Sequence, residues 1–312
     1  MRNHSSVTMF ILLGLTNDPR LEIMIFVFLL ITYLSSIIGN LIIIVLILMD
    51  PHLKTAMYFF LQNFSFLEIS FTTACVPTYL YMISSGDKTI SVGACFSQIF
   101  FIVLFGATDF FLLAVMSYDR YVAICKPLHY VTIMNSRVCR ILIICCWVSG
   151  LLIISPPLGL SLHLEFCGSV IDHYYCDASP ILNNSCSDTR FIERLIVACA
   201  VLTLIMTLVG VVISYICIIR MILRLPSVQQ RKKAFSTCSS HLIVVSLSYG
   251  SAISIYVKPS AKDEVTKDKV VSLLATSVAP LLNPFIYTLR NKQVRESFHN
   301  TLKSFIFISK KE

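Results

Sequence analysis

Charge is scarce in this sequence. Of its 312 residues, 13% are Asp, Glu, Lys or Arg, whereas 56% are hydrophobic and the mean hydropathy is +0.79. A water-soluble globular chain carries about 25% charged residues. The composition therefore excludes an ordinary soluble protein and predicts a chain whose natural solvent is the lipid bilayer.

Charge is most depleted in seven runs that are long enough to cross a bilayer, for which a helix needs about 20 mainly apolar residues. The first, fourth and fifth runs contain no charged residue, and the serine-rich sixth is the weakest. The seven spans are predicted at 23–49, 56–83, 89–118, 141–162, 195–219, 237–257 and 270–289. We predict an all-α membrane protein, a seven-transmembrane helix bundle at 23–290 between an extracellular tail at 1–22 and a cytoplasmic tail at 291–312.

Other absences bear on competing functions. A transporter or channel is the main rival class. Transporters typically have inverted repeats and spans broken at midplane, and the chain shows neither. No metal-spaced pair of histidines faces the core, which argues against a metal site and a membrane enzyme. The basic residues lie in separate short loops, which makes nucleic acid a poor partner. Residues 1–22 show no cleavable signal peptide, so the first span itself directs insertion.

The distribution of charge predicts the orientation. With the N-terminus outside, 16 of the 25 basic residues lie in inner segments and 11 of the 17 acids in outer ones, as the positive-inside rule requires. The inner excess also favours contact with anionic membrane lipids. The glycosylation sequons at Asn3 and Asn183 then lie outside. Four cysteines share this oxidising side and allow three pairings: Cys95, Cys167, Cys176 and Cys186.

Four polar side chains interrupt the spans at a similar depth, near mid-membrane: Asn40, Glu68, Asp109 and Asn283. An unpaired acid at that depth costs about 3 kcal/mol on insertion scales. One interpretation is an inward-facing polar core that shares a proton, water or a sodium ion and rearranges during switching. The alternative is that these groups only form hydrogen bonds between helices.

The inner ends of the spans carry further signals. The charged pair Asp119–Arg120 lies where the third span ends and a basic loop begins. This position indicates a surface that a cytosolic partner recognises. Pro284 removes a backbone hydrogen bond within the seventh span and favours a kink there. After Arg290, apolar residues recur every three or four positions, which predicts a short amphipathic helix on the inner leaflet: Val294, Phe298, Leu302 and Phe305.

The outer halves of the spans contain small or apolar residues and no carboxylate or ammonium. A cavity among them would hold a small, mostly neutral molecule, oriented by one or two hydroxyl contacts. Each residue taken alone serves packing as readily as ligand binding. The predicted lining is Ile102, Val103, Gly106, Ala107, Cys199, Thr203, Ala252, Tyr256, Leu273 and Thr276.

Together these features resemble the rhodopsin-like (class A) G-protein-coupled receptors and, among them, the tetrapod-type olfactory (odorant) receptors. The resemblance covers nearly the whole chain and rests on several motifs in one order. They are Gly39-Asn40, Met57-Tyr-Phe-Phe-Leu61, Met116-Ser-Tyr-Asp-Arg-Tyr-Val-Ala-Ile-Cys125, Lys126-Pro-Leu-His-Tyr130, Lys233-Ala-Phe-Ser-Thr-Cys-Ser-Ser-His-Leu242 and Pro280-Leu-Leu-Asn-Pro-Phe-Ile-Tyr-Thr-Leu-Arg-Asn291.

The resemblance implies a function and assigns roles to residues. It implies binding of volatile odorants, coupling to a stimulatory olfactory-type heterotrimeric G protein that raises cAMP, and location in the plasma membrane of olfactory cilia. It pairs Cys95 with Cys176 and Cys167 with Cys186. It places Tyr249 near the floor of the ligand pocket. The residues implied in coupling and switching are Asp119, Arg120, Tyr121, Tyr215, Asn283, Pro284 and Tyr287.

The sequence also departs from the family pattern. The family usually has Asp on the second span and Glu on the third, whereas here Glu68 and Asp109 are exchanged. The summed length of the two side chains is preserved, so we expect the polar core to be retained. Within the wider receptor class, an amine-binding receptor would carry an acid near Ile102, and a retinal-binding one a lysine near Ser277. Neither is present.

Overall fold

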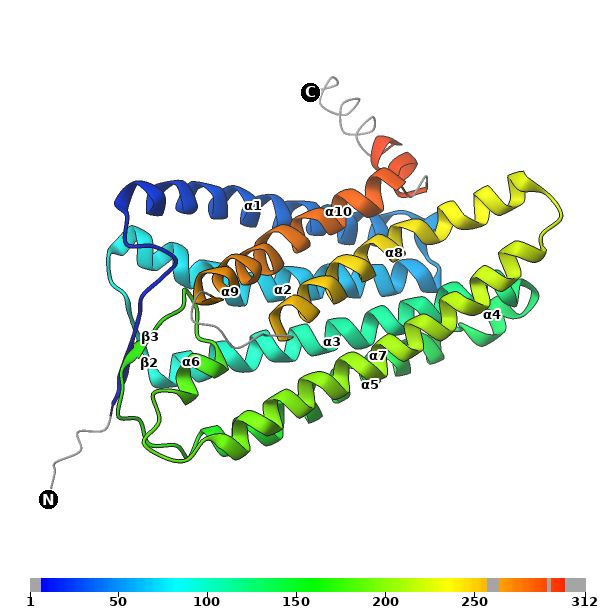
Figure 1. Ribbon diagram of the computed structural model, residues 1–312. Coiled ribbons are helices and arrows are strands. Elements are labelled where there is room, and N and C mark those ends of the chain that lie inside the picture. Colours follow the sequence, from blue (N-terminus) through cyan, green and yellow to red (C-terminus); the bar gives the residue numbers. More distant parts are fainter. Residues whose placement is uncertain (1–6, 257–263, 291–292, 301–312) are drawn as a thin grey trace, which may run out of the picture.

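Seven long helical segments lie side by side in the computed structural model, which describes residues 7–256, 264–290 and 293–300 (Figure 1). This arrangement confirms the predicted seven-helix bundle. The segments are α1 (Pro19–Met49), α2 (Ala56–Ser85), α3 (Val92–Cys125), α5 (Ser136–Ser161), α7 (Arg190–Arg224), α8 (Val228–Tyr256) and the last, which comprises α9 (Glu264–Leu273), the π-helical turn η3 (Leu274–Val278) and α10 (Ala279–Arg290).

Side chains at the helix ends explain where several of these helices begin. An N-cap oxygen satisfies backbone N–H groups that have no partner inside the helix. Asp18 accepts from the backbone N–H of Arg20 at 2.9 Å ahead of α1, and Asn135 accepts from two N–H groups ahead of α5. α2 ends at Gly86, whose positive φ of 72° suits glycine. The helices are therefore bounded by local chemistry as well as by the bilayer.

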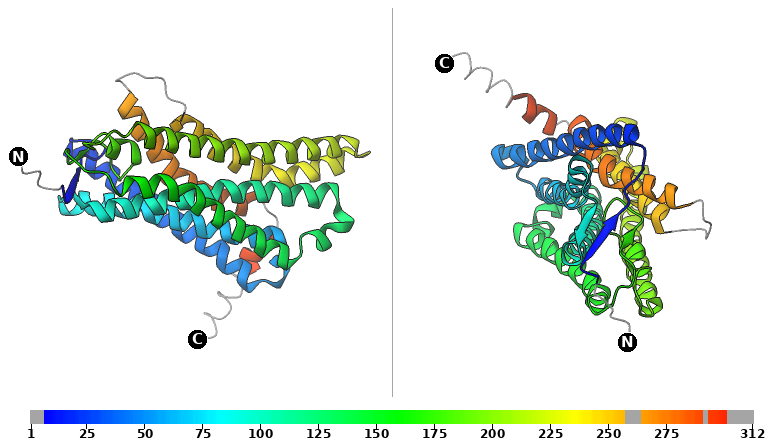
Figure 2. Two further views of the ribbon diagram at one scale, coloured as in Figure 1. Left: turned by 90° about the horizontal axis from the view of Figure 1, so that it is seen from below. Right: turned by 90° about the vertical axis from the view of Figure 1, so that its left-hand side faces the viewer.

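α3 is the central helix of the bundle and packs against α2, α5, α7 and α8, while α1 packs against α2 and α10. The end-on view in Figure 2 shows α1, in blue, along one edge of the bundle. Two glycines permit close approaches. A Cβ at Gly150 of α5 would lie 2.5 Å from the Thr108 hydroxyl of α3, and one at Gly39 of α1 would lie 3.0 Å from Pro284 of α10.

A three-stranded sheet caps one end of the bundle, which we call the outer end. Its strands are β1 (Met9–Leu12), β2 (Thr89–Ser91) and β3 (Val170–Ile171), in the order β2-β1-β3. β1 is antiparallel to β2 and parallel to β3. No strand was predicted within the N-terminal tail at 1–22, where the structure has β1. The prediction that a span begins at 89 was wrong, because residues 89–91 are β2 and the helix begins at Val92.

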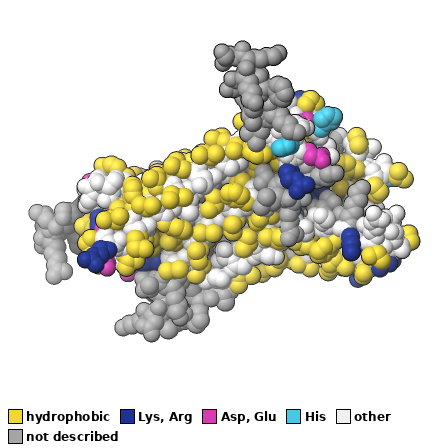
Figure 3. Space-filling view, turned by 90° about the horizontal axis from the view of Figure 1, so that it is seen from above, with side chains coloured by type: hydrophobic (Ala, Val, Ile, Leu, Met, Phe, Trp, Pro, Cys, Tyr) yellow, Lys and Arg dark blue, Asp and Glu magenta, His cyan; other side chains and the backbone are white. Residues whose placement is uncertain are grey.

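The surface of the bundle is apolar along its length. Figure 3 shows hydrophobic side chains covering the visible face, with the visible Lys and Arg near its two ends. Among the described residues, six helices are long and apolar enough to cross a membrane by themselves, and α8 is not one of them. The serines of α8 lower its hydropathy, as the sequence indicated, yet it packs against α3, α7 and α10 within the bundle.

The opposite end of the bundle, which we call the inner end, contains short helical turns: η1 (Pro51–Leu53), η2 (Pro127–His129) and α4 (Tyr130–Ile133). α7 has 35 residues, about 50 Å at the helical rise, and so exceeds the roughly 30 Å of a bilayer core. Residues 293–300 are helical, with Val294 buried and Phe298 exposed. Leu302 and Phe305, the rest of the predicted amphipathic face, lie outside the described residues.

Candidate functional site

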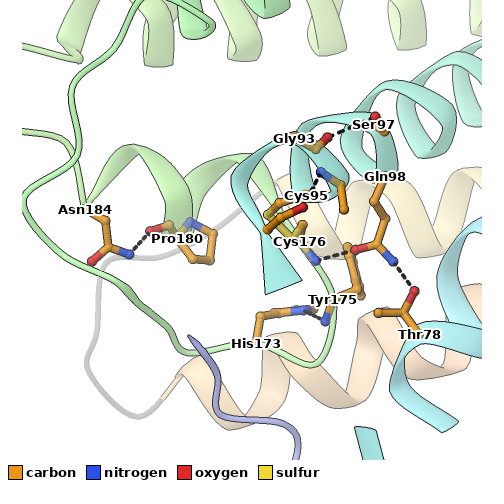
Figure 4. The surroundings of a disulfide bond; sticks show 12 residues. Thr78, Gly93, Cys95, Ser97, Gln98, His173, Tyr175, Cys176, Pro180 and Asn184 are labelled. Atoms are coloured by element: carbon orange, nitrogen blue, oxygen red, sulfur yellow. Dashed lines mark hydrogen bonds between the residues drawn. A yellow bond between two sulfur atoms is a disulfide. The ribbon is translucent and has the colours of Figure 1, made fainter. Parts of the chain in front are cut away.

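A disulfide joins the outer end of α3 to the connection between α5 and α7. Cys95 and Cys176 are bonded, with Cα atoms 5.4 Å apart. Beside them, the backbone N–H of Cys176 donates to the Gln98 side-chain oxygen at 2.9 Å (Figure 4). The amide nitrogen of Gln98 donates to the carbonyl of Ala74 on α2 at 2.9 Å. One side chain thus fixes the connection to two helices next to the bridge.

A second disulfide closes a loop within the same connection. Cys167 and Cys186 are bonded, with Cα atoms 5.3 Å apart. The short helix α6 (Ala178–Leu182) lies inside this loop, and the predicted glycosylation residue Asn183 follows it and is exposed. The other sequon, Asn3, lies outside the described residues. Both pairings implied by the resemblance are therefore formed in the structure.

Tyr174 inserts between helices at the outer end and is 1% exposed. Its hydroxyl lies 3.0 Å from the hydroxyl of Thr276 in η3, and its ring packs on Tyr79 of α2 with centroids 5.4 Å apart. His173 stacks on Tyr174 from the other side, at 4.7 Å. The loop therefore fills the space beside Thr276, a residue predicted to contact ligand.

A lysine also links the last helical segment to the loops at this end. The Lys269 ammonium of α9 donates to Asp172 at 2.6 Å and to the backbone carbonyl of Gly14 at 3.0 Å. The hydroxyl of Tyr79 accepts from the backbone N–H of Leu15 at 3.0 Å. The N-terminal segment is thus held by polar contacts from α2 and α9 as well as by the sheet.

The predicted ligand-binding residues divide between two levels of the bundle. Ile102, Val103 and Leu273 pack against an apolar cluster at the outer end that includes Tyr174 and Cys95. Tyr249 belongs instead to the cluster of the inner half and makes an edge-to-face contact with Phe110 of α3, with centroids 5.0 Å apart. This depth agrees with the role at the pocket floor that the resemblance implies for Tyr249.

The remaining predicted ligand-binding residues are at least partly buried wherever their side chains are described. The hydroxyls of Thr203 and Thr276 donate to backbone carbonyls of their own helical segments at 2.8 Å. The oxygen of Thr203 can therefore still accept a hydrogen bond, while that of Thr276 already contacts the hydroxyl of Tyr174. A Cβ at Gly106 would lie 3.6 Å from the ring of Phe71 on α2, an ordinary contact. Ala107 and Ala252 are buried and Cys199 is half-buried, while the side chain of Tyr256 lies outside the described residues.

A cavity of about 700 Å³ lies elsewhere, between the outer ends of α3 and α5 and the connection that follows α5. We call it the side cavity. None of the eleven predicted ligand-binding residues lines it; its wall includes Phe96, Phe100, Leu158 and Phe166. The sequence pattern gave no sign of this cavity, because its wall combines two helix ends with a loop distant in sequence.

The predicted polar core is assembled from α1, α2, α3 and α10. The side-chain amide of Asn283 donates to Glu68 at 2.5 Å, and that of Asn40 donates to the carbonyl of Pro280 at 3.4 Å. Asp109 lies close enough to Glu68 for their carboxyls to interact electrostatically. One buried oxygen of Asp109 has no hydrogen-bond partner among the described residues. The core thus joins α2 to α10 directly and leaves an acceptor unused.

At the inner end, the arginine of the Asp-Arg-Tyr motif is covered by protein. The guanidinium of Arg120 is paired with Asp119 and is 8% exposed. The other oxygen of Asp119 accepts from the hydroxyl of Tyr130 on α4 at 2.8 Å. Asp119 is therefore shared between the arginine and the short helix that follows α3, which holds this end closed.

A second contact closes the inner end between α7 and α8. The hydroxyl of Tyr215 lies 2.7 Å from Nδ1 of His241, and the two rings stack with centroids 5.9 Å apart. Tyr121 of the motif packs near Tyr118, with ring centroids 6.0 Å apart. Tyr287 lies in α10, but its side chain is outside the described residues. The predicted switch residues thus occupy three helices, α3, α7 and α10, of which α3 and α7 pack against each other.

Several residues of these networks were not assigned roles from the sequence. Tyr130 and His241 both belong to motifs that identified the family pattern, and their fixed spacing from Arg120 and Tyr215 was the available signal. Tyr174 gave a weaker signal, as an aromatic residue two positions before a bridged cysteine. Gln293, which accepts from the hydroxyl of Tyr58 at 2.6 Å, gave none.

Comparison with known proteins identifies the family. A family model described as "Olfactory receptor" matches residues 28–304. The chain belongs to the olfactory receptor family. It is 66% identical to human Olfactory receptor 6C2 and 63% identical to human Olfactory receptor 6C68, each over 312 residues that cover the whole of both chains.

The fold of this olfactory receptor agrees with that assignment. Squid rhodopsin superposes with a TM-score of 0.72 and 19% identity, covering 93% of this receptor and 87% of the rhodopsin chain. The protein is a multi-pass membrane receptor of the seven-helix type, and its family consists of signalling receptors and not of enzymes. Odorant reception is the function that the family supports.

Proposed function

We propose that this receptor binds small, mostly neutral volatile molecules between the outer halves of α3, α7, α8 and the last helical segment, and that binding activates a stimulatory heterotrimeric G protein to raise cAMP. The arrangement at the inner end supports this most: Arg120 is closed off by Asp119 and Tyr130, an arrangement that can open. A covered arginine is suited to a role in which a second state exposes it to a partner.

The outer half supports a neutral ligand. Ile102, Val103 and Leu273 converge on one apolar cluster, and the hydroxyl oxygen of Thr203 supplies an acceptor beside it. Small-molecule sites combine apolar walls with a few placed polar groups. Because Tyr174 packs against Thr276, we propose that the ligand reaches the pocket when the side chain of Tyr174 moves aside.

Coupling between the two ends follows from population shift. A ligand moves the equilibrium only by its differential affinity for the two states. A ligand that favours the state in which the inner ends of α3, α7, α8 and α10 move apart would break the contact of Tyr215 with His241 and uncover Arg120. Asn283 and Pro284 connect this motion to the last segment, because Asn283 is bonded to Glu68 and Pro284 packs against α1 at Gly39.

The polar core fits a sodium ion in the closed state. Hard monovalent and divalent cations prefer oxygen ligands, and the core offers the carboxyls of Glu68 and Asp109, including one buried oxygen that lacks a hydrogen bond. A bound cation would compensate buried negative charge there. The chain's own contribution is to keep the two carboxyls and Asn283 together on three adjacent helices.

We place the outer end outside the cell and Arg120 in the cytosol, in the plasma membrane and, by family, in olfactory cilia. The excess of basic residues in the inner segments and the two disulfides at the outer end support this orientation, because disulfides persist in oxidising compartments.

The test is Arg120→Ala in a cell-based cAMP assay against a broad odorant panel. The variant is expected to lose odorant-evoked cAMP while surface expression, measured by antibody against an N-terminal epitope, stays detectable. Arg137→Ala, at an exposed position in the first turn of α5 on the same side, is the matched control and should signal normally. Wild-type responses from Arg120→Ala would remove the proposed coupling role.

A further inference from the structure

The side cavity differs in chemistry from the proposed odorant pocket. Four phenylalanine rings, three from α3 and one from the connection that follows α5, line it: Phe96, Phe100, Phe101 and Phe166. The rings of Phe96 and Phe166 lie with centroids 6.1 Å apart, and those of Phe100 and Phe101 with centroids 5.2 Å apart. Aromatic faces carry partial negative charge and attract cations within about 6 Å.

One carboxylate lines the same cavity. Glu165 directly precedes Phe166 and is exposed. Its backbone carbonyl accepts from the N–H of Cys186 at 2.8 Å, next to the second disulfide, so its position is fixed. Its side chain forms no hydrogen bond or ion pair with the described residues. The acid is therefore held at the cavity by its backbone, and its carboxylate has no partner among the described residues.

Among the described residues, none that lines the cavity carries a positive charge. Apart from Glu165, these lining residues are apolar or aromatic, with the hydroxyl of Ser97 as a further polar group. Ser97 donates to the carbonyl of Gly93 at 2.9 Å (Figure 4), which leaves its oxygen able to accept. The available polar groups are thus all hydrogen-bond acceptors, and they suit a ligand that donates hydrogen bonds.

We propose that the side cavity binds small apolar molecules that carry a protonated amine. The apolar body would fill the space between Leu158 and the phenylalanine rings, and the ammonium would lie among the ring faces and the Glu165 carboxylate. The volume of about 700 Å³ is within the usual range of small-molecule sites, about 300–1,000 Å³. The proposal is independent of odorant signalling through the pocket between α3, α7 and α8.

A membrane acyl chain is the competing occupant. Phe101 is 45% exposed on the outside of the bundle, so lipid reaches the edge of the cavity. An acyl chain carries no charge within the cavity, so its binding would not depend on the charge of Glu165. The aromatic rings together with an unpaired carboxylate favour the amine, because apolar packing alone needs neither.

The experiment measures binding of a matched pair of probes to the purified full-length receptor in phosphatidylcholine nanodiscs at pH 7. Cyclohexylmethylamine is cationic and cyclohexylmethanol is its neutral near-isostere. Saturation-transfer NMR titrations, corrected with empty nanodiscs, give both affinities without any G protein. The amine is expected to bind about fivefold more tightly than the alcohol, from an exposed cation–π contact and a surface ion pair.

Variants assign that preference to the cavity. Glu165→Gln removes the charge and retains the shape, and should abolish most of the preference for the amine while leaving binding of the alcohol unchanged. Glu193→Gln removes the same charge from an exposed position in the first turn of α7 and should change neither affinity. Phe101→Leu should weaken the amine more than the alcohol.

Three results would overturn the proposal. The first is equal affinity of the two probes for the unmodified receptor. The second is no binding of either probe, as expected when an acyl chain fills the cavity. The third is an equal loss of amine binding in Glu165→Gln and Glu193→Gln, which would assign the preference to general surface charge. Because no cAMP response is read, a failure of the proposed odorant signalling leaves this test intact.

Discussion

The two ends of the bundle are closed by different kinds of interaction. The outer end has two disulfides, a three-stranded sheet and the buried ring of Tyr174. The inner end has side-chain hydrogen bonds: Asp119 with Arg120 and Tyr130, and Tyr215 with His241. Disulfides rearrange in minutes to hours, whereas helix motions take microseconds to milliseconds. We therefore expect the backbone of the outer end to keep its shape during signalling, and we propose that the inner end is the part that changes.

Breaking the outer end should have the largest effect. Cys95→Ser removes the bridge between α3 and the loop that carries Tyr174, and loss of a native disulfide costs about 2–5 kcal/mol. We expect surface expression, measured by flow cytometry, to fall severely. Cys145→Ser alters a free and exposed cysteine on α5 and should leave it unchanged. Normal surface levels of the first variant would show that the bridge is dispensable.

Loosening the inner end should have a smaller effect of a different kind. Tyr130→Phe removes a hydrogen bond to Asp119, the ion-pair partner of Arg120, from the closed state; a hydrogen bond to a charged group is worth about 1.5–3 kcal/mol. Basal cAMP without odorant should rise about tenfold, while surface expression stays near the wild-type level. Tyr118→Phe, a neighbouring and partly exposed tyrosine on α3, is the control. If both variants keep the wild-type basal signal, Asp119–Tyr130 is not a closing contact.

A milder change at the outer end sharpens the contrast. Tyr174→Phe removes only the hydroxyl contact with Thr276, worth about 1 kcal/mol, and retains the ring. The thermal midpoint of the purified receptor should fall by about 2 °C and basal cAMP should not change. Tyr81→Phe, on an exposed outer position of α2, should alter neither quantity. A raised basal signal in Tyr174→Phe would mean that the outer end also takes part in switching.

The smallest expected effect is a pH dependence confined to the outer end. Burial lowers the pKa of His173; the charge of Asp177 partly offsets this, and the charge of Lys269 lowers the pKa further. The unfolded chain then binds a proton more readily than the folded one, so stability is complete above the ordinary histidine pKa of about 6.5 and declines below it. From pH 7 to pH 5.5 the loss should be at most about 1 kcal/mol. Thermal unfolding of wild type and His173→Gln checks this, since the variant should lose the decline.

Hydropathy predicted the helices well because partition into lipid is decided by composition over about 20 residues. Hydropathy placed the ends of α7 and α3 less well, because a helix can continue beyond the bilayer into water until local sequence ends it. It also missed β1, whose partners at Ser91 and Val170 lie about 80 and 160 residues further along the chain. Pairing at such distance leaves no local pattern.

The candidate site likewise contains residues that the sequence located and partners that it did not. Fixed motifs located Asp119, Arg120 and Asn283 because their roles depend on position within one helix. Their partners Tyr130 and Glu68 lie on other elements, and only the packing of the bundle shows which oxygen each one contacts. The ligand-binding residues stay a prediction, and the side cavity could not be foreseen, since its wall forms only after Phe166 folds back onto α3.

The central place of β1 in its sheet sets the order in which the receptor can be completed during synthesis. This strand is translated first, yet its last neighbour, β3, ends at Ile171. At about 5–20 residues per second, the ribosome needs roughly 10 to 30 seconds to produce that neighbour. For that interval the strand has at least one open edge, a period in which a lumenal chaperone, or a second nascent chain, has access to it.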